Sequence, residues 1–536
     1  MLRRNVAVLL LALLVAGCRQ PAAEKAQADA GHPVPGDRLV VPIASDPPSL
    51  DFLTCTDAWC LLVARFVSDS LVDEGENLET VPRLASSWDL SGDGLRLSFH
   101  LRSGVRWHDG VPFTSRDVLF TYRRTVDPAS GARADQFQEI EEVTAPDDLT
   151  VEVRFRQPTV LALEMWKVPI LPEHLSASGA HPPDLPVGTG PYRMLRAVRG
   201  GEIVLQANDD YFLGRPYLDY LVFKVIPSPA TQFQALLTGE TDWSAVPASE
   251  WKSRSEDPGF RKRFRTFEYP ALFLNYFGWN ERTPFFGDAR VRKAMTLALD
   301  REGFARTVML GSAVVASSTF HPGQFGFDAS LKPLPYDLEQ AGRLLDEAGW
   351  KVAAGGLRRK GGREFRFSLL IFQGDPTTQQ LASLLKDSLS RLAVAVDIRV
   401  LDFPALLDRL HRRDFEAVLS GWSLTTDPDP TAMLHSSPAL GPSNYVGYAS
   451  PEMDRLLLEG RHQTDPAQRR ETYRRIQALE AAEQPYTPLF FPIQRVALDA
   501  RFHDVRSSAA ASPLRPYPGP LRWFVPAALQ KRVGPP

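Results

Sequence analysis

Residues 82–124 read PRLASSWDLSGDGLRLSFHLRSGVRWHDGVPFTSRDVLFTYRR. Apolar and polar side chains alternate over Leu95–Arg102, which predicts a strand with one buried face. Turn residues follow on both sides of a second, short predicted strand, Val105–Trp107. Thr114 stands three residues before Asp117, and this spacing is typical of a helix N-cap. The stretch is therefore predicted to form a compact unit of strands, turns and a helix.

Six further motifs occur along the chain in a fixed order. They are DPPSLD (46–51), GTGPY (188–192), QALLTGETD (234–242), FGDARVRKAMTLALDRE (286–302), YDLEQAGRLLDEAGW (336–350) and FEAVLSGW (415–422). Together with residues 82–124 they closely resemble the solute-binding proteins of dipeptide, oligopeptide and nickel ABC importers. The resemblance covers roughly residues 40 to 500. It implies a ligand carrier that needs no cofactor and is not an enzyme.

The fold implied by this resemblance is an α/β fold of the type II periplasmic-binding-protein class. It has two lobes, an extra inserted domain and a ligand cleft between the lobes. By resemblance, domain I is discontinuous and contains residues 37–69, 187–274 and 490–536, domain II is the insert 70–186, and domain III is 275–489.

The residue pattern of domain III supports an α/β lobe independently. Helical spacing of apolar residues occurs over 288–306 and 337–349. A strand, a helix and a second strand are predicted at 365–372, 379–392 and 394–400. This order is typical of a partly parallel sheet.

The amino-terminal residues have the pattern of an export signal. Two arginines precede the apolar run Val6–Ala16, whose eleven residues are too few to span about 30 Å of hydrocarbon. Val15–Cys18 resembles a lipobox and predicts that residues 1–18 are a lipoprotein signal ending in a diacylated Cys18. The alternative is an ordinary secretory signal with Cys18 incidental. Residues 19–36 are predicted to be a flexible tether.

The cysteine count is consistent with an exported protein. Of three cysteines, lipidation of Cys18 leaves Cys55 and Cys60, which can form a disulfide in an oxidising compartment. The alternative is a pair of buried free thiols. A zinc site at this pair would need two further ligands, so no metal site is predicted.

Charge and motifs exclude several functional classes. The formal net charge is −3, with 61 basic and 64 acidic residues spread along the chain, so no nucleic-acid surface is expected. P-loop, zinc-protease and nucleophile-elbow motifs are absent from the sequence. The isolated histidines His411 and His435 are better explained as surface or core groups than as metal ligands.

The segment after Gly421-Trp422 bears on the ligand. In the peptide-binding branches of the family that the chain resembles, the third residue after this pair is an aspartate that binds the peptide's amino terminus. Here that residue is Thr425, and the nearest acid is Asp427. Because a buried ammonium without an anionic partner is costly, either Asp427 takes over the contact or the ligand lacks a free α-amine.

Further ligand contacts are expected from the loop Thr56-Asp57-Ala58-Trp59, which matches a cleft-facing loop of the family, and from aromatic or polar residues of domain III. The complete set of candidate ligand-binding residues is Thr56, Asp57, Trp59, Tyr276, Phe403, Trp422, Ser423, Thr425 and Asp427. Aromatic rings offer large contact areas that suit ligand capture with loose specificity. For each aromatic residue the alternative is a plain core role.

The expected function is capture of a small solute and its delivery to an ABC permease by hinge closure. A peptide is the first expectation, followed by opine-like, sugar or metal–chelate solutes. The protein is expected to be a monomer on the periplasmic or cell-surface face of a bacterial membrane, attached only through Cys18. The alternative is a binding lipoprotein with a sensory or chaperone-like role that is not coupled to transport.

Overall fold

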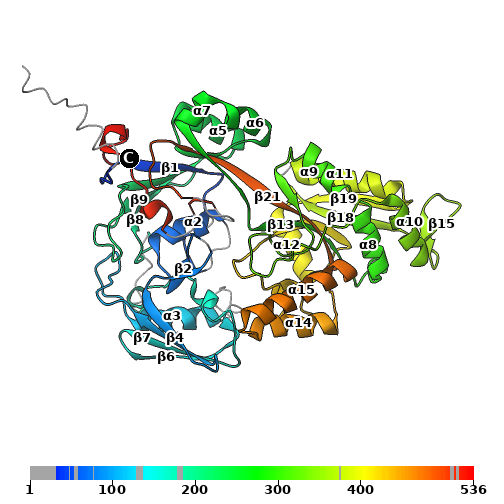
Figure 1. Cartoon of the computed structure of the whole chain (residues 1–536), viewed down its shortest axis with the longest axis horizontal. Coiled ribbons are helices and arrows are strands. Elements are labelled where there is room, and N and C mark those ends of the chain that lie inside the picture. Colours follow the sequence, from blue (N-terminus) through cyan, green and yellow to red (C-terminus); the bar gives the residue numbers. More distant parts are fainter. Residues whose placement is uncertain are drawn as a thin grey trace, which may run out of the picture.

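The computed structural model describes residues 32–47, 49–53, 58–76, 78–127, 137–177, 185–373, 376–506, 512–514 and 518–536. The molecule has two halves, which the long strand β21 connects (Figure 1). Within the described ranges, no helix has both the length and the hydrophobicity that a membrane span requires.

The first half contains a four-stranded sheet in the order β1-β10-β9-β8. Its strands are β1 (Arg38–Ile43), β10 (Tyr220–Val225), β9 (Glu202–Ala207) and β8 (Tyr192–Ala197). The pairing of β1 with β10 is parallel, although 176 residues lie between the end of β1 at Ile43 and the start of β10 at Tyr220. Helix α2 (Ala58–Val67) packs Val63, Phe66 and Val67 into the core beside this sheet.

The predicted insert has its own sheet and core. The sheet order is β4-β5-β7-β6, with β4 (Ala85–Leu90), β5 (Arg96–Leu101), β7 (Thr150–Phe155) and β6 (Ile140–Asp147). The smaller elements are β2 (Val72–Glu74), β3 (Thr80–Pro82), η3 (Glu164–Trp166) and α4 (Glu173–Ala177). The alternation predicted for β5 is confirmed, because Leu97, Phe99 and Leu101 are buried in the core of this sheet.

The rest of the stretch 82–124 is confirmed in part. Helix α3 (Ser115–Val126) begins after Thr114, whose backbone N–H donates to Asp117 Oδ2 at 2.9 Å. The short strand predicted at 105–107 is wrong, since only an isolated bridge between Arg106 and Pro112 forms there. The turn residues reverse the chain direction after one bridging pair, so the two segments are too short to form a paired strand.

The largest sheet joins the two halves, in the order β11-β21-β13-β20-β18-β19, with β12 and β14 also paired to β21. Its strands are β11 (Trp243–Ala245), β12 (Phe264–Pro270), β13 (Phe273–Trp279), β14 (Ala313–Val315), β18 (Arg366–Phe372), β19 (Ala395–Leu401), β20 (Ala417–Ser423) and β21 (Tyr486–Asp499). The domain limits expected at 274/275 and 489/490 fall inside β13 and β21. These two strands are therefore the continuous connections between the halves.

Strands β18, β19 and β20 confirm the partly parallel sheet that the sequence predicts, since β18 pairs in parallel with both neighbours. The helix between β18 and β19 is α11 (Pro376–Ser390). Residues 288–306 form two helices, α8 (Ala289–Leu297) and α9 (Arg301–Thr307). The break comes at Asp300, whose carboxylate accepts the Gly303 N–H at 2.7 Å and starts the second helix.

The remaining elements cover the sheets or form small hairpins. They are α5 (Pro229–Thr238), α6 (Ala248–Glu256), α7 (Pro258–Arg263), α10 (Leu338–Glu347), β15 (Lys351–Val352), β16 (Arg358–Lys360), β17 (Arg363–Glu364), α12 (Phe403–Arg412), α13 (Thr431–Leu434), α14 (Pro451–His462), α15 (Pro466–Glu483), η4 (Gly519–Leu521) and η5 (Ala527–Leu529). Helix α10 confirms the helical spacing over 337–349, and it begins after Asp337, whose carboxylate accepts the Gln340 N–H at 2.8 Å.

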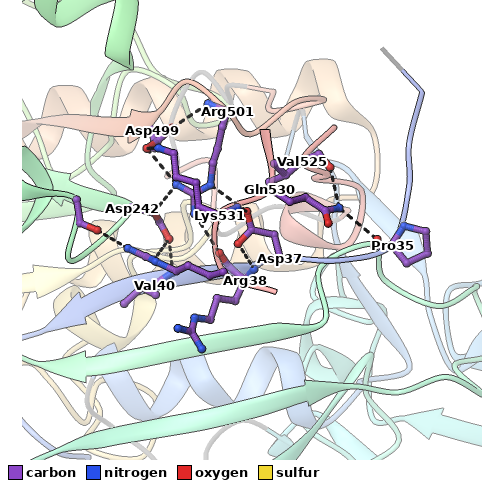
Figure 2. A network of polar contacts seen from close by, with 12 residues as sticks. Pro35, Asp37, Arg38, Val40, Asp242, Asp499, Arg501, Val525, Gln530 and Lys531 are labelled. Carbon is purple, nitrogen blue, oxygen red and sulfur yellow. Dashed lines mark hydrogen bonds and ion pairs between the residues drawn. The ribbon is translucent and has the colours of Figure 1, made fainter. Parts of the chain in front are cut away.

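A buried ionic network joins residues near both ends of the described part of the chain to the first half (Figure 2). Arg501 lies 2.6 Å from Asp242, 3.0 Å from Asp499 and 3.2 Å from Asp37. Arg532, near the carboxyl terminus, adds a second contact to Asp242 at 2.6 Å. Because Asp37 precedes β1 and Asp499 ends β21, the network joins the first and last strands of the fold.

The GTGPY motif packs tightly against the end of α2. A Cβ atom on Gly188 would lie 1.8 Å from the carbonyl oxygen of Val67, so only glycine fits this position. His108, in the predicted turn RWHDG, approaches the same motif with Nε2 2.9 Å from the Gly190 carbonyl oxygen. Two sequence motifs of the insert and of the first half therefore meet at one junction.

Candidate functional site

A cavity of about 570 Å³ lies where the three predicted domains meet, and it is called the main cavity below. Strand β1, helix α2 and strand β11 form one side, and Ser423-Leu424 after β20 reach it from the other half. Lys167 and Pro169 reach it from the insert. Most of the lining is apolar, including the rings of Trp59, Trp243 and Tyr269.

A second cavity of about 360 Å³ lies between the insert and domain III, and it is called the acidic cavity. Six carboxylates line it, against three basic side chains: Asp73, Glu74, Glu139, Glu164, Asp427 and Asp429, with Arg65, Lys167 and Arg461. The two cavities share Arg65, Asp73 and Lys167 as lining residues, so they are neighbours.

Arg461 holds the insert and domain III together beside the acidic cavity. Its guanidinium lies 2.7 Å from Asp429 in domain III and 3.2 Å from Glu139 in the insert. Its backbone carbonyl oxygen accepts the Val160 N–H of the insert at 3.0 Å. These side chains are nearly inaccessible to solvent, which strengthens the electrostatic attraction between them.

Asp427 lines the acidic cavity, but its carboxylate already has a cationic partner. Arg469 Nη2 donates to both Oδ1 and Oδ2 of Asp427, each at 2.8 Å. Burial raises the pKa of Asp427, and the charge of Arg469 opposes that shift. The geometry therefore gives little support to Asp427 as the group that binds a ligand amine.

Four of the candidate residues line the cavities. Trp59 and Ser423 line the main cavity, and Thr425 and Asp427 line the acidic cavity. The Thr425 hydroxyl donates to the Asp427 carbonyl oxygen at 2.6 Å, which fixes the loop after β20. The structure thus brings Trp59 of α2 and Ser423 of β20 to one cavity, and their role in ligand binding stays a prediction.

Three aromatic candidates line neither cavity. Tyr276 is 1% exposed and stacks on Trp422, with ring centroids 3.8 Å apart, so this pair belongs to the core of domain III. Phe403 begins α12 and is 58% exposed. Thr56, Asp57 and Cys18 lie outside the described residues.

Cys60 is buried in α2 and is disulfide-bonded. Its partner lies outside the described residues, so pairing with Cys55 stays a prediction. His411 contacts the ring of Tyr445, and His435 Nδ1 lies 3.6 Å from Asp454. Within the described ranges, no three His, Cys, Asp or Glu side chains are placed to hold a metal ion.

Sequence reasoning missed the contribution of the insert to the site. Glu74 ends β2 and lines the acidic cavity beside Asp73, and Lys167 lines both cavities. The acidic run Asp73-Glu74 after a short apolar stretch was the one available signal for Glu74. Lys167 follows a buried Trp166, and its sequence context gives no comparable signal.

The two halves share strands β13 and β21, and neighbouring cavities lie between them. This arrangement defines the class of solute-binding proteins that hold a ligand between lobes. The chain belongs to the bacterial extracellular solute-binding proteins of family 5, whose "Middle" sequence model matches residues 79–443. The resemblance stated from the motifs is therefore confirmed, as is the α/β fold class.

Curated relatives match most of the chain. It is 30% identical to "Oligopeptide-binding protein AppA" of Bacillus subtilis (strain 168) over 510 residues, which are 92% of this chain and 93% of that protein. It is 29% identical to "Di/tripeptide-binding protein 4" of Pseudomonas aeruginosa (strain UCBPP-PA14) over 450 residues, which are 77% and 81% of the two chains.

Solved structures agree with the fold. AppA from Bacillus subtilis in complex with a nonapeptide superposes with a TM-score of 0.81 at 28% identity and covers 92% of this chain and 100% of that one. NikZ from Campylobacter jejuni in complex with Ni(L-His) gives 0.78 at 22% identity, with coverage of 92% and 100%. At that identity the second likeness shows the fold alone.

Proposed function

We propose that the protein captures a peptide or a similar small solute outside the cytoplasm and delivers it to an ABC permease. The observation that carries the proposal is the main cavity, which lies at the junction of the halves and has the volume of a small-molecule site. Membership of family 5 and the likeness to a structure that holds a nonapeptide support this reading.

The lining of the main cavity suits ligands of varied sequence. Trp59, Trp243 and Tyr269 offer flat apolar surfaces with a polar edge, and Gln232 and Ser244 add hydrogen-bonding groups. Apolar contacts of this kind contribute affinity without selecting one side chain. The acidic cavity next to it offers charged groups that can orient one end of the ligand.

Closure of the halves around the ligand is part of the proposal. Strands β13 and β21 connect the halves, so a small change of backbone angles in them would open or close the cavity. Closure would exclude water and strengthen polar contacts to the ligand. The contact of Arg461 with Glu139 lies between the moving parts and would favour the closed arrangement.

Attachment to the membrane through diacylated Cys18, with residues 19–36 as a tether, completes the proposal. A lipid with more than one acyl chain anchors a protein stably. We infer a monomer that docks on separate permease subunits, with the ATPase on another polypeptide. That separation would account for the lack of a P-loop motif in the sequence.

Native mass spectrometry of the protein, purified without refolding, tests the proposal. We expect a co-purified solute that dissociates on unfolding, and a smaller radius of gyration in small-angle scattering when that solute is added back to the stripped protein. A protein that carries no solute and binds no member of a broad peptide and small-solute panel would contradict it.

A further inference from the structure

We infer that Glu74 binds a cationic nitrogen of the ligand, an ammonium or a guanidinium group, in the acidic cavity. This inference rests on the proposed function and names the charge that the site selects. It moves the cation contact from domain III, where Thr425 and Asp427 were the candidates, to β2 of the insert.

Glu74 differs from the other carboxylates of the acidic cavity in its charge partners. The other five each lie within ion-pair distance of a basic side chain: Asp73 with Arg65 (3.1 Å), Glu139 with Arg461 (3.2 Å), Glu164 with Lys167 (2.5 Å), Asp427 with Arg469 (2.8 Å) and Asp429 with Arg461 (2.7 Å). Glu74 has no such partner in the described part of the chain. Among the described residues, Glu74 is therefore the carboxylate of the acidic cavity that lacks an ion-pair partner.

The hydrogen bonds of Glu74 are also incomplete. The residue is 4% exposed, and its Oε2 accepts a hydrogen bond from the hydroxyl of Thr426 in domain III. Its Oε1 is buried and has no hydrogen-bond partner among the described residues. An ionised carboxylate oxygen buried without a donor is costly, and a cationic ligand group in the cavity would remove that cost.

The contact with Thr426 places Glu74 where a ligand group would meet both lobes. Glu74 is at the end of β2, and Thr426 follows Thr425, the residue that stands in place of an acid. The hydroxyl of Thr426 orients the carboxylate from the opposite lobe. A charge-assisted hydrogen bond to Glu74 would therefore form fully only when the lobes are together.

The cationic nitrogen can come from the α-amine of a peptide or from a lysine or arginine side chain. Three probes separate these sources: tetraalanine, N-acetyl-tetraalanine, and an N-acetylated tetrapeptide with one alanine replaced by lysine. Isothermal titration calorimetry on the full mature chain would measure each affinity for the wild type and for Glu74→Gln. The glutamine keeps an acceptor for Thr426 and removes only the charge.

We expect the wild type to bind at least one of the two cationic probes about tenfold to a hundredfold more tightly than N-acetyl-tetraalanine. Glu74→Gln should remove that preference, and Glu74→Asp should retain part of it. A preference for tetraalanine would show that Glu74 binds the α-amine. A preference for the lysine peptide would show that Glu74 binds a basic side chain. Unchanged melting temperatures would show that the variants are folded.

Glu76→Gln is the matched control, since Glu76 lies in the same segment and lines neither cavity. It should bind all probes as the wild type does. Equal cation preference in wild type and Glu74→Gln would overturn the inference and leave the proposed function standing. If Glu164→Gln lost as much of the cation preference as Glu74→Gln, the effect would come from the total charge of the cavity, and the inference would also be overturned. A wild type that binds none of the probes would overturn the peptide proposal and this inference together.

Discussion

Arg469 Nη2 lies 2.8 Å from each carboxylate oxygen of Asp427, and Asp427 lines the acidic cavity. The side chains of Arg469 and Asp427 are 10% and 14% exposed, so each charge depends on the other for compensation. The acid nearest to Thr425 is thus part of the wall of the site, whereas Glu74 lines the same cavity without an ion-pair partner among the described residues.

The substitution Asp427→Asn should lower the stability of the fold more than it lowers the affinity for the ligand. Loss of the carboxylate leaves the Arg469 guanidinium nearly buried without its anionic partner, which costs about 3 kcal/mol in the free energy of unfolding. Urea unfolding would measure the loss. The control is Asp408→Asn, which breaks an exposed pair with Arg412 on α12 and should cost under about 0.5 kcal/mol. Equal stability of Asp427→Asn and wild type would contradict the structural role.

Gly188→Ala should destabilise the junction between GTGPY and α2. The added Cβ would lie 1.8 Å from the Val67 carbonyl oxygen, so the backbone must move, at a cost of about 3 kcal/mol. Gly92→Ala is the control, because no atom lies within 4 Å of the Cβ that it would add. Chemical denaturation would compare the two variants, and similar unfolding midpoints would refute the tight fit.

Because of Glu480, the free energy of unfolding should fall as the pH rises. Burial raises its pKa to about 7, and hydrogen bonds from Thr319 oppose that rise. The folded state therefore keeps a proton that the unfolded chain, with a pKa near 4.5, releases. The stability that this proton contributes is complete below about pH 4.5 and is lost by about pH 7.

Urea unfolding at pH 5 and pH 8 tests this dependence. The loss of unfolding free energy between these pH values should be smaller in Glu480→Gln than in wild type by about 2–3 kcal/mol. Glu471→Gln changes an exposed residue on the same helix and should keep the wild-type dependence. An identical pH dependence in Glu480→Gln and wild type would show that Glu480 does not retain the proton.

The Cys55–Cys60 pairing predicts that neither thiol reacts with an alkylating reagent under denaturing, non-reducing conditions. Cys60 is disulfide-bonded in the structure. Closure of so short a loop is expected to stabilise the fold by about 2 kcal/mol at most, so reduction should lower the melting temperature only slightly. Complete labelling of both cysteines in the exported protein would rule out the bridge.

Lipidation of Cys18 predicts a diacylglyceryl adduct in the mass spectrum of the membrane fraction. Cys18→Ala should remain as precursor or appear in the soluble fraction, because the anchor is lost. The natural control is the Cys60→Ala variant, which should still be membrane-bound. Wild-type protein that is wholly soluble and starts at another residue would refute the anchor.

Much of the fold follows from short-range patterns in the sequence. Alternation identified β5, the N-cap at Thr114 identified the start of α3, and apolar spacing identified α10. Ordered motifs identified the family, because each motif describes a turn or a helix whose geometry its own residues fix. The break between α8 and α9 was missed, since helical spacing continues across Asp300 although its side chain caps a new helix.

The binding site was decided by the tertiary structure. Asp427 and Arg469 are 42 residues apart, and Glu74 and Thr426 are 352 residues apart. Which carboxylate is neutralised and which faces a ligand depends on how β2, the β20 loop and α15 meet after the chain has crossed between the halves. Local periodicity and capping determine single elements, whereas charge compensation in a cavity depends on contacts between distant segments, and those exist only once the elements have packed.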